Sequence, residues 1–253
     1  MAQYRATFEC QPCPQVQCPS TRTWTTPLNL FVIIPVMNEH DTLVELAQKI
    51  RSNTPDHHLR ILFINDGSTD GSKEILDELN TEFDDIDVLH FAKNQGKSAA
   101  LSEGFARAEG DAVITMDSDL QDDPTEIPKF LDALNQGYDL VTGWKVVRHD
   151  PWHKTLPSKI YNTFVCRLFG IHLHDINCGF KAMTLEVAKS LELKHDYHRL
   201  IPVLANLKGF SITEIEVHHH PRRYGKSKYG IARFWHGLRD IGRVWRDKNK
   251  LSH

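Results

Sequence analysis

The chain has 253 residues, of which 40% are hydrophobic and 25% are charged, and its formal net charge is −3. This length and composition are typical of one soluble globular domain with tails. The near-neutral charge gives no reason to expect a nucleic-acid partner, and no apolar run approaches the roughly 18–20 residues that a membrane-spanning helix needs. The first residues lack the charged-then-apolar order of a secretory signal, so we predict a cytoplasmic protein.

Residues 1–27 are predicted to form a flexible leader that is rich in Pro, Gln and Thr. Its Cys10, Cys13 and Cys18 are spaced in a way that suggests zinc, but a closed zinc site takes four ligands and a defined partner pair. We therefore interpret these cysteines as reduced thiols in a disordered segment.

From residue 30 the pattern becomes regular. Strands are predicted at 30–35, 60–65, 87–91 and 111–116, and helices at 41–51, 70–79 and 97–108. Strands that alternate with helices at this spacing are typical of βαβ units, and they predict an α/β fold with a mostly parallel sheet covered on both faces. Right-handed crossovers place the C-terminal ends of these strands on one edge, where ligands bind in such sheets.

The second half is less periodic. We predict a strand at 139–143, a helix at 154–170, a tight segment at 176–183, a helix at 197–207 and a strand at 210–217. A basic loop follows at 218–228. The three consecutive histidines, 218–220, alternate faces in an extended chain, so we assign them structural or surface roles rather than one metal site.

Polar or acidic groups follow each of the first four predicted strands. These groups are Asn38 and Glu39, then Asn65 and Asp66, then Lys97, and finally Asp117 and Asp119. Because the four strand ends meet at one edge, we predict that these groups converge on one site.

The most informative segment is 112–121, where an apolar run ends in Asp117 and Asp119, with Gln121 two residues further on. In an extended chain, alternation would put all three side chains on one side. Neighbouring carboxylates repel each other unless a positive charge lies between them, and Mg²⁺ prefers oxygen ligands that it shares with substrate phosphates. The pattern predicts a divalent cation that bridges the protein and a phosphorylated ligand; the alternative is a solvated loop.

Ordered motifs support this interpretation. They are Phe31-Val-Ile-Ile-Pro-Val-Met-Asn-Glu39, Phe63-Ile-Asn-Asp-Gly-Ser-Thr-Asp70, Asn94-Gln-Gly-Lys97, Asp117-Ser-Asp-Leu-Gln121 and Asp175-Ile-Asn-Cys-Gly-Phe-Lys181. Together they resemble the family 2 glycosyltransferases, which have the GT-A fold. The tail from 214 to 229 resembles the polyprenyl-phosphate subgroup, which includes dolichyl-phosphate mannose synthases and bactoprenol glucosyltransferases. The resemblance covers roughly residues 29–245.

The resemblance implies roles for these residues. A nucleotide sugar would be bound by Pro35, Asn38, Glu39, Asp66, Lys97 and Asp117. Mg²⁺ or Mn²⁺ would be held by Asp119 and Gln121 together with the diphosphate. Asp117, Asp119 and Asp175 would form the catalytic set, although turn capping is an equal alternative for Asp175. Asn65, which replaces a more frequent Asp, favours UDP-glucose over GDP-mannose as the hexose donor.

The implied acceptor is a polyprenyl phosphate, whose oxygen attacks the sugar C1 and inverts it. Holding two anionic groups together in a poorly solvated site costs several kcal/mol unless cations intervene. The candidates for acceptor-phosphate binding are Lys145, Arg148, Lys154, Arg222 and Lys226. The family often has Arg at positions 145 and 154, and a Lys there lacks the bidentate fork.

The C-terminal segment carries the expected link to a membrane. Residues 222–250 contain ten Lys and Arg against two acids, and the apolar residues of 231–245 form one helical stripe: Ile231, Phe234, Trp235, Leu238, Ile241, Val244 and Trp245. This pattern predicts an amphipathic helix in the membrane interface; the alternative is a helix packed on its own domain. Since the chain stops at His253, we expect a peripheral protein, a partner of a membrane subunit or a truncated one.

The sequence therefore predicts three parts: a leader (1–27), a GT-A glycosyltransferase domain (28–230) and an interfacial helix with a tail (231–253). Two rival functions stay open. One is a family 2 transferase with a saccharide or protein acceptor, which would need a carboxylate base and no basic loop. The other is a non-catalytic protein that binds sugar nucleotides or serves as a membrane scaffold.

Overall fold

The computed structural model describes residues 24, 27–146, 152–221 and 232–251, and for 152–160, 232–236, 238 and 249–251 it describes the backbone alone. The predictions for the leader before Trp24 and for Arg148, Arg222 and Lys226 therefore lie outside the described residues. The same holds for the Lys154 side chain.

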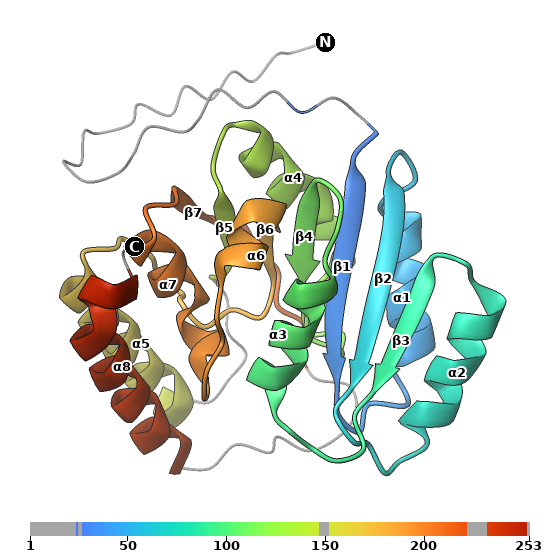
Figure 1. Ribbon diagram of the computed structural model, residues 1–253, viewed down its shortest axis with the longest axis horizontal. Helices are drawn as coiled ribbons and strands as arrows, with labels where there is room; N and C mark the ends of the chain where they lie inside the picture. The colour runs from blue at the N-terminus through green and yellow to red at the C-terminus, as the bar shows by residue number, and fades with distance from the viewer. Residues whose placement is uncertain (1–23, 25–26, 147–151, 222–231, 252–253) are drawn as a thin grey trace.

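A seven-stranded sheet forms the centre of the molecule (Figure 1). Its strands are β1 (Asn29–Val36), β2 (His58–Asn65), β3 (Ile86–His90), β4 (Ala112–Thr115), β5 (Leu140–Lys145), β6 (Lys181–Thr184) and β7 (Ile212–Val217). The order is β3-β2-β1-β4-β6-β5-β7, and β6 is antiparallel to both of its neighbours while the other pairs are parallel. This confirms a mostly parallel sheet.

The helices are α1 (Leu43–Ser52), α2 (Ser72–Glu82), α3 (Lys97–Arg107), α4 (Ile127–Asn135), α5 (Trp152–Phe169), α6 (Leu185–Ser190), α7 (Ile201–Leu207) and α8 (Ala232–Leu251). Two short 3₁₀ helices are η1 (Pro124–Glu126) and η2 (Tyr197–Leu200). The elements of the first half match their predicted positions to within a few residues. Further along the chain, η1, α4, β6 and α6 were not predicted as elements, since 176–183 was expected only as a tight segment, and the single helix predicted at 197–207 is split into η2 and α7.

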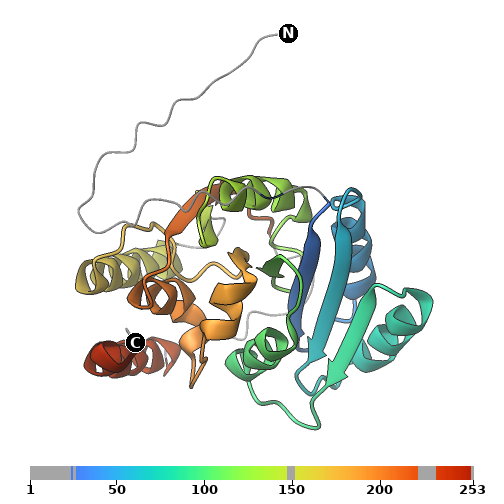
Figure 2. The same cartoon turned by 45° about the horizontal axis from the view of Figure 1, so that its top comes forward.

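Two apolar cores cover the two faces of the sheet, because successive side chains of a strand point to opposite sides. On β1, Val32 and Ile34 join a core with α1, α2 and α4, whereas Phe31 and Ile33 join a core with α3, α5, α6, α7 and α8. Figures 1 and 2 show α1 and α2 on one face of the sheet and α3 on the other. The strands whose C-terminal ends form the site edge are therefore packed against helices on both faces of the sheet.

Helix α8 packs on the domain along part of its length, beside α5 and α7 (Figures 1 and 2). Ile241 and Val244 of the predicted stripe are buried in the second core, and Asp240 is buried as well. Trp245 is 49% exposed. The described part of the stripe is therefore divided between the domain and the surface, while Ile231 and the side chains of Phe234, Trp235 and Leu238 lie outside the described residues. Among the described residues, no helix combines the length and the apolar character that crossing a membrane requires.

Helix α3 approaches β1 so closely that its Gly104 has no room for a side chain. A Cβ added there would lie 2.5 Å from Cγ2 of Ile33, which is fully buried. Overpacking a core costs about 1–3 kcal/mol, which exceeds the gain of about 1 kcal/mol when Ala replaces Gly in a helix. We expect Gly104→Ala to lower the free energy of urea unfolding.

Two further variants test this steric origin. Gly242→Ala, at a position of α8 with open space around it, should raise the free energy of unfolding by about 1 kcal/mol. In an Ile33→Ala background, which removes the opposing side chain, Gly104→Ala should no longer destabilise the protein. An equal loss of stability in both backgrounds would contradict the close contact.

Candidate functional site

The loop after β3 is fastened to the end of β2 by one carboxylate. Asp66 is 4% exposed, and its two oxygens accept hydrogen bonds from the backbone N–H groups of Gln95 and Gly96 at 2.6 and 2.9 Å. Gly96 has φ of 91°, in the region that favours glycine, just before α3 begins. Asp66, predicted to bind the nucleotide, thereby shapes the loop that presents Lys97.

Lys97 connects the loop after β3 to the loop after β4. It is the first residue of α3, and its ammonium forms an ion pair with Asp117, which follows β4. Burial raises the pKa of the Asp117 carboxyl, but the charge and hydrogen bond of Lys97, together with the charges of Lys145 and Lys181, outweigh this and hold the pKa well below its ordinary value. A Cβ on Gly179 would lie 2.6 Å from an Asp117 oxygen, so the turn before β6 closes against this carboxylate.

The segment after β4 turns rather than continuing as an extended chain, so the predicted alternation of 117, 119 and 121 is wrong. Leu120 has φ of 56°, a left-handed conformation that reverses the chain direction. Asp119, which is 7% exposed, accepts a hydrogen bond from the Gln121 backbone N–H at 3.2 Å. The two predicted metal ligands are therefore neighbours through the turn.

A third carboxylate, Asp122, belongs to the same loop and was not predicted. It is buried, and its Oδ1 lies 3.0 Å from the ammonium of Lys145 at the end of β5. Burial lowers the pKa of Lys145, but the charge and hydrogen bond of Asp122, together with the charges of Cys178 and Asp117, outweigh this and raise it. Lys145 thus directs its charge at a carboxylate inside the protein, and its role in acceptor-phosphate binding stays a prediction. In the sequence, the close spacing of Asp122 to Asp117 and Asp119 is the feature that indicates that Asp122 belongs to the same acidic loop.

The histidine run 218–220 docks on this loop. His218 Nδ1 lies 2.5 Å from Glu126 Oε1, His219 Nε2 lies 3.2 Å from Gln121 Nε2, and His220 Nε2 lies 2.9 Å from Asp123 Oδ2. The backbones of Asp122 and His219 form an antiparallel bridge. The three imidazoles contact three different partners, and the structural or surface roles expected for the run stay a prediction.

The turn at 175–181 brings a buried lysine, Lys181, to the site. This lysine was not among the predicted site residues. Lys181 is 2% exposed, and its ammonium donates to the carbonyl oxygen of Cys178. Burial lowers the pKa of Lys181 and raises that of the Cys178 thiol to about 12. The Asp175 carboxylate accepts from the Asn177 N–H at 3.2 Å, which is turn capping. Its role toward the sugar or an acceptor-side cation stays a prediction.

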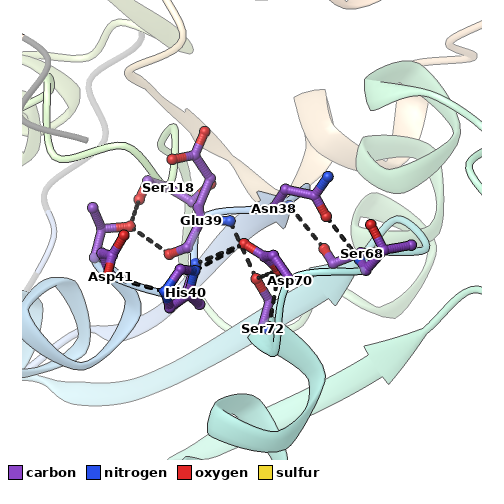
Figure 3. A network of polar contacts seen from close by, with 10 residues as sticks. Asn38, Glu39, His40, Asp41, Ser68, Asp70, Ser72 and Ser118 are labelled. Carbon is purple, nitrogen blue, oxygen red and sulfur yellow. Dashed lines mark hydrogen bonds and ion pairs between the residues drawn. The ribbon is translucent and has the colours of Figure 1, made fainter. Parts of the chain in front are cut away.

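A network of polar contacts fixes the loop after β1 to the loop after β2 (Figure 3). Asn38, at φ of 54°, donates its N–H to Ser68 Oγ at 2.9 Å and accepts from the Thr69 N–H at 2.7 Å. The Glu39 N–H donates to Ser72 Oγ at 3.1 Å. Pro35 lies in β1 and is half-buried. The predicted nucleotide-binding residues Pro35, Asn38, Glu39, Asp66, Lys97 and Asp117 are thus held by neighbouring strand ends of one sheet.

Asp70 lies at the centre of this network (Figure 3). Its carboxylate accepts hydrogen bonds from the Ser72 N–H and hydroxyl at 3.1 and 2.5 Å, and from the His40 N–H at 3.3 Å. Burial raises the pKa of Asp70, but these hydrogen bonds outweigh it and lower the pKa to about 2. The N-cap of α2 is Gly71 rather than Asp70, so the predicted cap is wrong by one residue; Asp70 precedes the cap and accepts from the N–H of Ser72, the first helical residue.

We expect Asp70→Asn to destabilise the protein at neutral pH. Lowering the pKa from 3.8 to about 2 corresponds to roughly 2 kcal/mol of stability. Because the folded pKa lies below the unfolded one, this stabilisation is present above about pH 4 and is lost as the pH falls toward about 2. Urea unfolding at a series of pH values should show the difference from the wild type shrinking over that range. Asp56→Asn, at an exposed position, is the control, and a difference for Asp70→Asn that is independent of pH would contradict the assignment.

The residues of the 117–122 loop fit a hard divalent cation. Asp119 and Gln121 provide a carboxylate and an amide oxygen, which are ligands that Mg²⁺ and Mn²⁺ accept. No group of three or more His, Cys, Asp or Glu side chains suited to a metal ion occurs in the part of the chain that the structure describes. Two protein ligands leave coordination positions for phosphate oxygens, as in sites where the cation is shared with a substrate.

Solved structures confirm the GT-A fold. The chain is similar to glucosyl-3-phosphoglycerate synthase from Mycobacterium tuberculosis in complex with UDP, with a TM-score of 0.65, 19% identity, and coverage of 87% of this chain and 80% of the other. A complex of that synthase with Mn²⁺, UDP-glucose and glycerol 3-phosphate gives a TM-score of 0.62 at 19% identity, covering 88% and 78% of the two chains.

Curated relatives are more similar in sequence. Two proteins named undecaprenyl-phosphate 4-deoxy-4-formamido-L-arabinose transferase, from Aeromonas hydrophila and Edwardsiella ictaluri, are each 34% identical to this chain over 213 residues, which is 83% of its length. The chain spans about 65% of the length of these relatives. The model of the family described as glycosyl transferase family 2 matches residues 31–191. The chain belongs to glycosyl transferase family 2.

Proposed function

We propose that this protein transfers a sugar from a nucleoside diphosphate sugar to a polyprenyl phosphate at a membrane surface, with inversion at C1. The observation that carries the proposal is the 117–122 loop, which gathers carboxylate and amide oxygens beside Lys97 and Lys145 where β4 ends. The names of the relatives, which act on undecaprenyl phosphate, support the lipid acceptor.

Departure of a nucleoside diphosphate builds negative charge that the site has to offset. Asp119 and Gln121 would hold a divalent cation, which when bound neutralises the leaving diphosphate as a Lewis acid. Lys97 is paired with Asp117, and Lys145 is paired with Asp122. Because each of these ion pairs is neutral overall, the two lysines add no net positive charge to the site. The remaining positive charge is proposed to come from Arg222 and Lys226.

The acceptor needs little activation. A lipid monophosphate is anionic near neutral pH, so its oxygen attacks C1 without a strong general base, and the task of the protein is to hold two anions close together. The rival transferase with a saccharide hydroxyl as acceptor would need a carboxylate base beside that hydroxyl, and the names of the relatives favour the phosphate acceptor over it.

The donor is proposed to carry UDP. The solved neighbours were crystallised with UDP or UDP-glucose, and Asn65 favours the same nucleotide. The relatives are named for 4-deoxy-4-formamido-L-arabinose, a sugar with a five-carbon skeleton, so the expectation of a hexose is widened to include substituted pentoses. Incubation with Mn²⁺, a short-chain prenyl phosphate and a panel of UDP- and GDP-sugars, with mass analysis of the lipid, identifies the donor.

Asp119→Ala should lower transfer to the prenyl phosphate by about two orders of magnitude or more, because one ligand of the cation that would neutralise the leaving diphosphate is lost. Far-UV circular dichroism and the melting temperature should stay unchanged. Asp132→Ala, at an exposed position of α4, is the matched control. If Asp119→Ala turns over as fast as the wild type at saturating Mn²⁺, the proposed role of this carboxylate is wrong.

We propose that α8 presents Trp245 to the cytoplasmic membrane face. Trp245 is 49% exposed, and the Lys248 ammonium lies 5.5 Å from its ring centroid. An aromatic ring flanked by basic residues is typical of a helix at an anionic lipid interface.

Trp245→Ser should therefore reduce the fraction of protein that sediments with vesicles containing phosphatidylglycerol. Val44→Ser removes an apolar side chain that is 44% exposed on α1, and it should leave binding unchanged. Equal binding of wild type and Trp245→Ser would favour a membrane subunit as the link to the lipid.

A further inference from the structure

The side chain of Gln121 is held by the segment that contains the three histidines. Its amide nitrogen, Nε2, lies 3.2 Å from His219 Nε2 and 3.3 Å from the backbone oxygen of His220. The backbone of this segment is also attached to the loop. The His220 N–H donates to the backbone carbonyl oxygen of Gln121 at 2.9 Å, and the backbones of His219 and Asp122 form a β-bridge. The contacts of the Gln121 amide therefore come from a segment that is itself attached to the same loop.

The His220 contact determines which way the amide faces. A backbone carbonyl oxygen accepts hydrogen bonds and cannot donate them. If the amide were rotated by half a turn, its Oε1 would face the His220 oxygen, and two acceptors would repel each other. The nitrogen therefore faces the histidine segment, and Oε1 lies on the other side of the amide carbon.

The contact with His219 adds to this orientation. Because the amide nitrogen of Gln121 only donates, His219 Nε2 is the acceptor of this contact. The NH₂ group has two hydrogens and here has two acceptors, so both are used. The only atom of the Gln121 side chain that can ligate a cation is then directed away from the histidines.

We propose that His219 is a positioning residue that holds the Gln121 amide with its oxygen available to the divalent cation. This inference rests on the proposed function, which places the cation at Asp119 and Gln121. His219 acts through Gln121 and does not itself ligate the metal. Partners that orient metal ligands commonly affect metal affinity by about 10–100-fold.

The test measures Mn²⁺ affinity of the protein without substrate, by the electron paramagnetic resonance signal of free Mn²⁺. His219→Leu removes the acceptor and should raise the dissociation constant about tenfold or more. His219→Gln, whose carbonyl oxygen also accepts, should restore most of the affinity. His220→Ala keeps the backbone oxygen that contacts Gln121, so it should bind Mn²⁺ as the wild type does.

A second background separates positioning from direct ligation. In Gln121→Glu, either carboxylate oxygen can ligate, so adding His219→Leu should have little effect on the dissociation constant. If His219→Leu weakens binding equally in both backgrounds, His219 ligates the metal itself and the positioning role is wrong.

Asp119→Ala distinguishes failure of the inference from failure of the proposed function. If Asp119→Ala weakens Mn²⁺ binding and His219→Leu does not, only the positioning role is overturned. If neither variant changes the dissociation constant, the cation is bound elsewhere and the proposed metal site falls with it.

Discussion

Repulsion between carboxylates is the constraint on which the rest of the site depends. Asp117, Asp119 and Asp122 lie within one short loop, and like charges so close together destabilise a fold unless each has a partner. The ammonium of Lys97 pairs with Asp117, that of Lys145 pairs with Asp122, and Asp119 accepts from the loop backbone. The two lysines come from α3 and β5, so the loop is stable only when elements distant in the sequence are assembled around it.

The other loops at this edge are fixed by hydrogen bonds from backbone N–H groups to carboxylates and hydroxyls rather than by lysine–carboxylate ion pairs. Asp66 holds the loop that precedes α3, and the Asp70 network holds the loops after β1 and β2 to each other. These contacts use N–H groups that would otherwise need water, and they order the edge before any ligand arrives. A site arranged in this way loses little conformational entropy on binding a nucleotide.

The sequence predicted the first half of the fold well because its strands and helices alternate with clear turn residues. The helical spacing of Ile127, Phe130, Leu131 and Leu134 likewise indicates α4. The antiparallel direction of β6 and the left-handed Leu120 were beyond local pattern reasoning, because each depends on the assembled sheet. The pairing of Asp122 with Lys145 is likewise a contact between distant segments.

The central claim is that the 117–122 loop binds a cation together with a departing diphosphate. A crystal grown with Mn²⁺ and UDP, with diffraction recorded near the manganese absorption edge, tests it most directly. The account predicts an anomalous peak within coordination distance of the Asp119 carboxylate and the Gln121 Oε1 atom, in contact with the diphosphate. An anomalous peak at another position, with the Asp119 and Gln121 side chains contacting only protein atoms, would contradict it.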